Sequence, residues 1–285
     1  METYRTKAYA KINLGLDVTG RLPNGYHQVR MIMQQIGIYD ELVFERAGGD
    51  IVITTDNKTL PLDEKNLIYK AAGHMMKTYG ICKGLRVHLN KKIPIAAGLA
   101  GGSTDAAATI KAMNHLFELN LPLSRLMEEG AAIGADVPYC ILGGTALAEG
   151  IGEKLTPLPS LPACLVLVAK PEASVSTPYV YTRLDAMAIP HHPDIDGMAD
   201  SIKAGNLGGI LERMENVLEI VTIRDHPVIA ALKERMLRLG AAGSLMSGSG
   251  PTVFGIFEKE DTAQKAYRIM KEEACAKELF LTEAH

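Results

Sequence analysis

The sequence predicts an α+β protein of two domains, and three observations support this prediction. The chain has 285 residues, which is more than a single core usually holds. Strand-like and helical patterns alternate along it, and a hairpin comes late, an order typical of an α+β sandwich. The segment 156–162 contains three prolines, Pro157, Pro159 and Pro162, and therefore cannot lie inside a helix or a central strand. We therefore expect the domain boundary here, between domains 1–156 and 163–285.

The composition is that of an ordinary globular protein. It is 47% hydrophobic and 22% charged, with a net charge of -3, so nothing indicates a nucleic-acid or anionic membrane surface. The four cysteines form no C-x-x-C pair, which argues against a zinc site and fits a reducing cytoplasm. No signal peptide is apparent. The longest weakly polar stretch, 131–148, is a poor membrane span because it contains Asp136 and Pro138. We expect a cytoplasmic protein without a nucleic-acid or membrane partner; the oligomeric state is not predicted.

The first domain is expected to alternate strands with helices. Apolar and polar residues alternate over 8–18 and 85–90, the period of a half-buried strand. Ser124 is expected to cap a helix that stops near Gly134. The remaining expected elements are strands over 41–45 and 50–55 and a helix over 66–79.

The second domain is expected to open with a buried strand over 164–169. A glycine turn then joins two strands of a hairpin, and a later helix starts at Asp261 with Gln264 as its capping-box partner. The other expected elements are helices over 207–220 and 227–239, hairpin strands over 244–247 and 252–257, and a terminal strand at 280–281.

The most informative segment is 94–105, with the sequence PIAAGLAGGSTD. It follows the strand 85–90 and precedes apolar residues at helical spacing. A glycine loop between a strand and a helix start presents backbone N–H groups and a positive dipole end to an anion such as phosphate. The structural alternative is a tight turn that Ser103 or Thr104 caps.

Two pairs near the N-terminus carry candidate chemistry. Lys11 and Asn13 share one face of the first strand, because strand side chains alternate; the alternative is a solvated polar face. Asn24-Gly25 predicts a turn, and Tyr26 and His27 at its exit could stack on a base and hydrogen-bond to it. The alternative is a hairpin turn with an exposed imidazole.

Three later features are equally open. Asp136 precedes Pro138, which suits the first turn of a short helix, so the carboxylate is either a helix cap or a base for a substrate hydroxyl. The turn 247–251, SGSGP, is either a second phosphate loop or a plain hairpin connection. Tyr179 and Tyr181 either stack on a base or cover the edge of a core.

Familiar nucleotide signatures are missing from the sequence. There is no Walker A Gly-Lys-Ser/Thr, no protein-kinase motif set and no complete G-x-G-x-x-G. Three other motifs, in the right order along the chain, resemble those of the GHMP kinase superfamily. They are the opening segment 8–14, the loop 94–105 and the segment 246–251. Thr104 stands where this family more often has a second serine, and the hydroxyl is kept.

Further details resemble the branch of this superfamily whose substrate carries a cytidine diphosphate arm. The segments 24–27 and 134–138 carry that resemblance, and Tyr181 matches a stacking position that is often Phe, on a looser alignment. The resemblance implies a ribosomal protein S5 domain 2-like N-terminal domain and a ferredoxin-like C-terminal domain. It also implies an ATP-dependent kinase that phosphorylates the C2 hydroxyl of a methylated sugar alcohol.

The resemblance assigns roles to particular residues. Asp136 would take the proton from the hydroxyl, and Lys11 would hold that carboxylate ionised and stabilise the attacking oxygen. Mg²⁺ would accompany ATP, with Thr104 as its hydroxyl ligand. Residues for the cytidine diphosphate arm are Asn13, Tyr26, His27, Thr177 and Tyr181. The ATP loop comprises Pro94, Ile95, Ala96, Ala97, Gly98, Leu99, Ala100, Gly101, Gly102, Ser103 and Thr104.

Alternative functions remain open at this point. Another GHMP kinase, acting on homoserine or mevalonate, would have no evident use for Tyr26 and His27 as readers of a base. A non-catalytic RNA-binding module is disfavoured by the negative net charge. A dinucleotide-dependent dehydrogenase is disfavoured by the incomplete glycine fingerprints.

Overall fold

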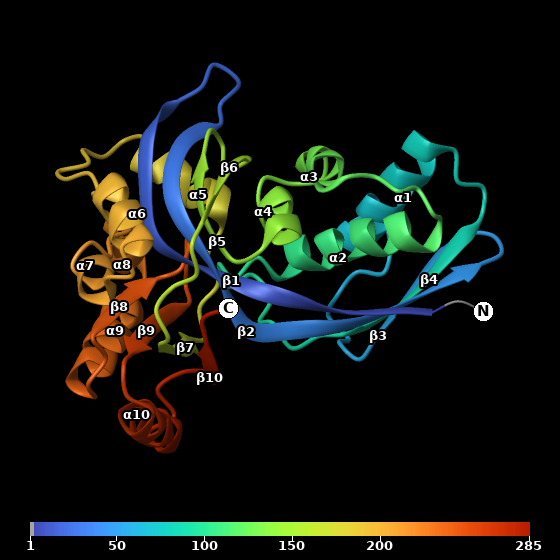
Figure 1. The fold of residues 1–285 in the computed structure, drawn as a ribbon. Coiled ribbons are helices and arrows are strands. Elements are labelled where there is room, and N and C mark those ends of the chain that lie inside the picture. Colours follow the sequence, from blue (N-terminus) through green and yellow to red (C-terminus); the bar gives the residue numbers. More distant parts are fainter. Residues whose placement is uncertain (1–2) are drawn as a thin grey trace. The chain divides into compact units, whose positions relative to one another are not determined.

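The computed structural model describes residues 3–285, and the chain forms two compact units (Figure 1). Unit 1 comprises residues 3–10, Ile38–Ile95 and Ala100–Gly143; unit 2 comprises Lys11–Gly37, Ala96–Leu99 and Gly144–His285. Packing divides the chain in this interleaved way because two long strands, β1 (Thr3–Arg21) and β2 (His27–Ala47), contribute residues to both units. The expected domain boundary between 156 and 163 stays a prediction.

Unit 1 is a sheet with helices over one face (Figure 1). Strand β4 (Gly84–Asn90) pairs antiparallel with β2 and parallel with β3 (Ile51–Thr55). Buried Leu85, Val87 and Leu89 alternate with exposed residues along β4, as the sequence period predicts. The helices are α1 (Leu67–Tyr79), α2 (Gly101–Leu116), α3 (Leu123–Ala131) and α4 (Val137–Leu142).

Local chemistry fixes the two longer helices of unit 1. Asn66 caps α1 by accepting a hydrogen bond from the Ile68 N–H, and left-handed Gly80 ends the helix. Helix α2 is rich in buried alanine, which lets it approach α1 closely. Its core-facing side chains, Ile110 and Met113, pack with Phe44 of β2 in one hydrophobic cluster.

Unit 2 contains an antiparallel four-stranded sheet in the order β10-β7-β9-β8. These strands are β7 (Leu165–Lys170), β8 (Gly243–Met246), β9 (Val253–Phe257) and β10 (Glu278–Glu283). Helices α9 (Val228–Arg238) and α10 (Glu260–Glu272) pack on this sheet, which agrees with the implied ferredoxin-like domain. All five residues of β9 are buried.

The rest of unit 2 is built from short elements. Strand β5 (Thr145–Glu149) pairs with Met31–Gln34 of β2 and with β6 (Lys154–Leu158), so Pro157 lies on an edge strand where the missing N–H is tolerated. The remaining helices are α5 (Thr177–Leu184), α6 (Ile195–Lys203), α7 (Leu207–Leu211) and α8 (Glu219–Asp225).

Several expected elements are wrong in detail. Pro122, not Ser124, is the N-cap of α3, which ends at Ala131. The capping box of Asp261 and Gln264 does not form, because α10 begins at Glu260 and Gln264 hydrogen-bonds to that side chain instead. The single helix over 207–220 is replaced by α7 and α8. The expected elements also lacked α5, α6, β5 and β6.

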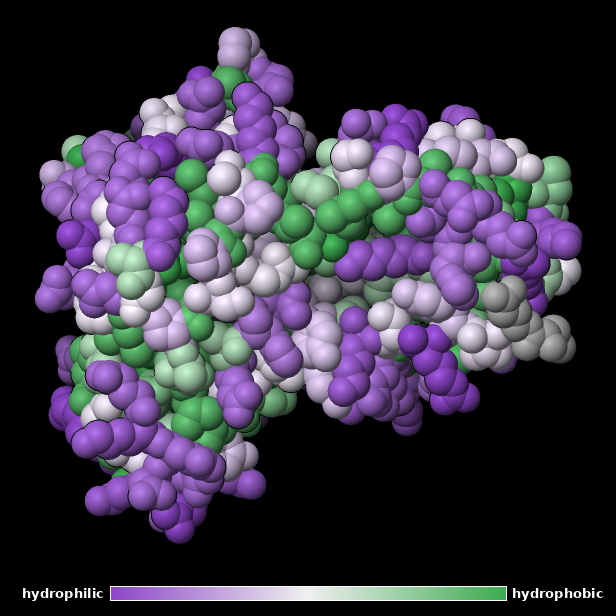
Figure 2. All heavy atoms as spheres, in the orientation of Figure 1, coloured by the Kyte–Doolittle hydropathy of each residue, from purple (hydrophilic) through white to green (hydrophobic). Residues whose placement is uncertain are grey.

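The surface agrees with the ordinary globular composition of the sequence. Hydrophilic residues cover most of the visible face of each unit in Figure 2, with smaller hydrophobic areas between them. Among residues 3–285, no helix has the length and apolar character that a membrane span requires.

Candidate functional site

The backbone of the predicted phosphate loop repeatedly adopts a left-handed conformation. Ala96, Gly98 and Ala100 have φ values of 51°, 73° and 57°. Such alternation turns successive N–H groups toward a common side and makes a concave anion site. Ala100 is the N-cap of α2, and no side chain caps this helix. The alternative interpretation, a turn capped by Ser103 or Thr104, is therefore wrong, and the first amides of α2 are left for a ligand.

The second glycine turn meets the first within unit 2. The Ser247 Oγ donates a hydrogen bond to the Gly98 carbonyl oxygen, with 2.9 Å between the oxygens. A Cβ placed on Gly98 would lie 2.3 Å from the Ser247 carbonyl oxygen, so only glycine permits this approach. The turn 247–251 is thus more than a plain hairpin connection, because it also contacts Gly98 of the predicted phosphate loop.

A buried asparagine that the sequence analysis missed holds the second turn in shape. The Asn216 Nδ2 donates to the carbonyl oxygens of Met246 (2.9 Å) and Gly248 (2.8 Å), and its Oδ1 accepts from the Leu218 N–H. Asn216 also bridges to Leu16 of β1, which explains why the expected helix over 207–220 is broken there. Asn216 stands between Glu215 and the apolar Val217, so its local sequence offered no clear signal.

Lys11 and Asn13 lie side by side on β1, as their spacing predicts, but they are not on a solvated face. Lys11 is 5% exposed and Asn13 is fully buried, with 2.6 Å between the Lys11 Nζ and the Asn13 Oδ1. Both side chains face the second turn, because a Cβ on Gly248 would lie 3.5 Å from each of these two atoms. Lys11 forms no salt bridge with any residue of the described chain. A buried ammonium without a counter-charge favours an anionic ligand.

An aromatic group stands at the end of the turn 21–26. The ring centroids of His27 and Tyr181 are 4.8 Å apart with a tilt of 32°, and Tyr26 beside them is 58% exposed. The His27 Nε2 lies 2.7 Å from the Asp185 Oδ1, and Arg21 pairs with the same carboxylate at 3.2 Å. The sequence analysis missed Arg21 and Asp185, since nothing in their spacing links them to the histidine.

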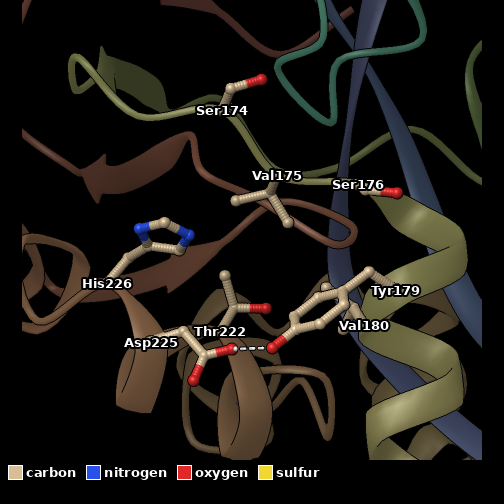
Figure 3. Close-up of a pocket in the computed structure, with 8 residues that line it drawn as sticks. All are labelled: Ser174, Val175, Ser176, Tyr179, Val180, Thr222, Asp225 and His226. Carbon is tan, nitrogen blue, oxygen red and sulfur yellow. Dashed lines mark hydrogen bonds between the residues drawn. The ribbon is translucent and has the colours of Figure 1, made fainter.

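Helix α5 connects this aromatic group with the second glycine turn. Thr177, in its first turn, has its Oγ1 2.7 Å from the Ser249 Oγ, and Tyr181 follows one helical turn later. Tyr179 of the same helix points elsewhere: its hydroxyl donates to Asp225 at 3.1 Å in a separate cavity of about 510 Å³ (Figure 3). The two tyrosines therefore have different neighbours: the Tyr181 ring lies against His27, and the Tyr179 hydroxyl bonds to Asp225.

In unit 1, Asp136 precedes the short helix α4. It has helical φ and ψ values of -82° and -13°, and its side chain makes no capping hydrogen bond. Asp136 thus occupies the N-cap position, but its side chain does not cap the helix; Pro138 lies in the first turn as predicted. The half-buried carboxylate is thus free of that structural role.

A buried charge cluster that the sequence analysis missed lies beneath the start of α2, also in unit 1. Lys91 contacts Asp40 and lies 2.8 Å from the Asp105 Oδ2. Asp40 also accepts the N–H groups of Lys92 and Ile93. Burial raises the pKa of Asp105 above its usual range; Lys91 opposes this shift and Asp40 adds to it. The cluster fixes the strand end before the loop to the helix after it.

Among residues 3–285, no group of three or more His, Cys, Asp or Glu side chains could hold a metal ion. A Mg²⁺ ion that arrives on nucleotide phosphates needs only one or two protein oxygens, because it keeps several waters. The hydroxyls of Ser103, which is half-buried, and Thr104, which is 3% exposed, are suitable oxygens at the start of α2. The residues present therefore fit a phosphate-bound Mg²⁺.

The fold and this site define a class of protein. The family model described as "GHMP kinases N terminal domain" matches residues 66–144, and "GHMP kinases C terminal" matches 198–277. The chain belongs to the GHMP kinase family of ATP-dependent small-molecule kinases.

Several kinases are similar to this chain over most of its length. The 4-diphosphocytidyl-2-C-methyl-D-erythritol kinase of Lachnospira eligens is 51% identical over 284 residues, which cover 99% of each chain. The kinase of the same name from Acetivibrio thermocellus is 50% identical over 271 residues, covering 95% of this chain and 96% of that protein. A crystal structure of 4-(cytidine 5'-diphospho)-2C-methyl-D-erythritol kinase is 32% identical with a TM-score of 0.82, over 99% of each chain. Homoserine kinase from Cytophaga hutchinsonii, 20% identical with a TM-score of 0.78 over 100% of this chain and 95% of that one, shares the fold.

Proposed function

We propose that this protein transfers the terminal phosphoryl group of ATP to the C2 hydroxyl of 4-diphosphocytidyl-2-C-methyl-D-erythritol, a step in non-mevalonate isoprenoid biosynthesis. The observation that carries the proposal is the buried Lys11 ammonium, which has no counter-charge in the described chain and lies beside Gly248. A phosphate of the nucleotide or of the substrate's diphosphate arm supplies that charge. The names of the relatives support the choice of substrate.

Phosphoryl transfer needs positioning and charge stabilisation more than covalent work by the protein. In this proposal the amides of the loop 94–104 and the start of α2 bind the phosphates of ATP. Mg²⁺, when bound with ATP, neutralises phosphate charge, and Thr104 is its predicted hydroxyl ligand. The absence of a side-chain cap on α2 supports this role, since those N–H groups are available to an anion.

The attacking hydroxyl must lose its proton as the new bond forms. We assign this proton to Asp136, whose side chain makes no capping bond that would compete. The base need not be strong, because the loose transition state makes early deprotonation unnecessary. Lys11 stabilises the negative charge on the oxygens of the phosphoryl group during its transfer.

The cytidine diphosphate arm is assigned to the polar face of β1 and to the aromatic group. Tyr26 and Tyr181 offer rings on which cytosine can stack, and His27 offers hydrogen bonds to its edge. Asn13 and Thr177 complete the predicted set, and each lies within hydrogen-bond distance of another residue of this region. A cytoplasmic location is part of the same proposal.

An ADP-release assay tests the proposed function with three acceptors. We expect turnover with 4-diphosphocytidyl-2-C-methyl-D-erythritol and none above background with homoserine or mevalonate. Turnover with either control acceptor at a comparable kcat/KM would assign the chain to another substrate. ADP release that needs no acceptor would mean that the protein hydrolyses ATP instead.

A further inference from the structure

Asp185 lies beside the aromatic group, and no predicted role uses it. It ends helix α5 at the C-cap position, four residues after Tyr181. The His27 Nε2 lies 2.7 Å from one oxygen of its carboxylate, and the Arg21 guanidinium lies 3.2 Å from the other. The His27 side chain is only 11% exposed, whereas that of Asp185 is 29% exposed. The carboxylate therefore orients a largely buried ring from its solvent side.

This contact decides which nitrogen of His27 carries the proton. An ionised carboxylate can only accept hydrogen bonds, so the His27 Nε2 must donate. In the neutral ring the other nitrogen, Nδ1, then presents a lone pair. Within residues 3–285, Nδ1 has no hydrogen-bond partner, so it is available to a ligand as an acceptor. Arg21 pairs with the second oxygen of the same carboxylate at 3.2 Å.

We infer that Asp185 is a positioning residue that makes the protein prefer cytosine to uracil. This inference rests on the proposed function. Cytosine carries an amino donor at the ring position where uracil carries a carbonyl acceptor. A lone pair on Nδ1 accepts a hydrogen bond from the amino group of cytosine. With uracil, the same lone pair faces a carbonyl oxygen, and two acceptors cannot form a hydrogen bond. Tyr26 and Tyr181 cannot make this distinction, because stacking depends little on the identity of the base.

Asp185→Asn tests the inference without removing the side chain. An amide can donate to Nε2, which allows the ring to carry its proton on Nδ1 and to bind the uracil carbonyl; replacing a carboxylate behind histidine in this way changes the tautomer while keeping the geometry. We expect the wild type to bind cytidine diphosphate about 10- to 100-fold more tightly than uridine diphosphate. The variant should lose most of that ratio. Glu234→Gln, an amide substitution at an exposed carboxylate of α9, is the matched control and should keep the wild-type ratio.

Two readouts keep the inference separate from the proposed function. Binding of the two diphosphates is measured by calorimetry, so it needs no phosphoryl transfer. Nitrogen-15 NMR of the His27 ring reports the protonated nitrogen, which we expect to be Nε2 in the wild type at about pH 8. An unchanged cytidine-to-uridine ratio in Asp185→Asn, or a wild-type ring protonated on Nδ1 alone, would overturn the inference. Loss of turnover with intact base discrimination would instead count against the proposed function.

Discussion

The Ser247 hydroxyl donates a hydrogen bond to the Gly98 carbonyl oxygen at 2.9 Å and so joins the two glycine-rich segments. The serine carbonyl in turn occupies the space where a side chain at residue 98 would start. The two residues are 149 positions apart in the sequence. The loop at Gly98 is therefore shaped by a tertiary contact as well as by its own glycines.

Gly98→Ala should disrupt ATP binding through this contact. The new Cβ would lie 2.3 Å from the Ser247 carbonyl oxygen, so the loop must shift. We expect the KM for ATP to rise at least about tenfold, which corresponds to about 1.4 kcal/mol of lost binding. Steady-state kinetics at varied ATP concentration measure this change.

Gly205→Ala is the matched control for Gly98→Ala. Gly205 has a similar positive φ of 65°, but no atom lies within 4 Å of its added Cβ. It should lose about 1 kcal/mol of stability from backbone strain and keep the wild-type KM for ATP. Equal KM values for ATP in both variants would contradict the claim that the close approach of Gly98 to Ser247 matters for ATP binding.

Lys11→Met should separate activity from stability. Removing a buried charge without a counter-charge offsets the loss of its hydrogen bond to Asn13. We expect kcat to fall at least about 100-fold, as for a lost electrostatic contact to transferring oxygens. The free energy of unfolding should stay the same or rise by up to about 2 kcal/mol.

Urea unfolding and turnover of the same Lys11→Met sample check both statements. Lys70→Met, at an exposed position of α1, should change neither quantity by more than experimental error. A large loss of stability in Lys11→Met with little loss of kcat would identify Lys11 as a structural residue instead.

Lys91→Met should be the most destabilising of the lysine substitutions. It leaves the buried carboxylates of Asp40 and Asp105 without their shared cation, which costs about 3–5 kcal/mol. Lys92→Met, which breaks a half-exposed pair with Glu41 at 3.1 Å, should cost about 1 kcal/mol or less. Urea unfolding compares the two variants directly. Similar losses in the free energy of unfolding would contradict a stabilising role for the buried charge cluster.

Asp105 should also make stability depend on pH. Burial raises its pKa in the folded state, so the folded protein binds more protons than the unfolded chain between the ordinary and the raised value. The contribution of this group to the free energy of unfolding is therefore lost as pH rises through that window. Asp105→Asn cannot titrate, so its stability relative to the wild type should rise with pH above about 4. A difference that stays flat or falls with pH would contradict the assigned direction.

The parts of the fold and site that the sequence predicted are those with local causes. Asn66 and Gly80 bound α1, alternation marks β4, and the loop at Gly98 is recognisable from its small residues. The errors have long-range causes. Asn216 breaks an expected helix because it bonds to a turn 30 and 32 residues away. Asp185 meets His27 across 158 residues, so no spacing rule could reveal it.

Asp136→Asn should leave stability unchanged, because its side chain makes no capping bond. Asn66→Ala, which removes a real cap on α1, should lose about 1 kcal/mol and keep its activity. Thermal unfolding of the two variants compares these effects. A destabilised Asp136→Asn would favour a structural role for that carboxylate.

The central claim is that this chain moves a phosphoryl group from ATP to the cytidylated sugar alcohol with Asp136 as the base. The most direct measurement is single-turnover transfer from ATP labelled on its terminal phosphate, with 4-diphosphocytidyl-2-C-methyl-D-erythritol as acceptor. We predict that the wild type places the label on the C2 oxygen of the acceptor, and that folded Asp136→Asn does so about 100- to 10,000-fold more slowly. Label found only in inorganic phosphate, or an Asp136→Asn rate equal to that of the wild type, would contradict the claim.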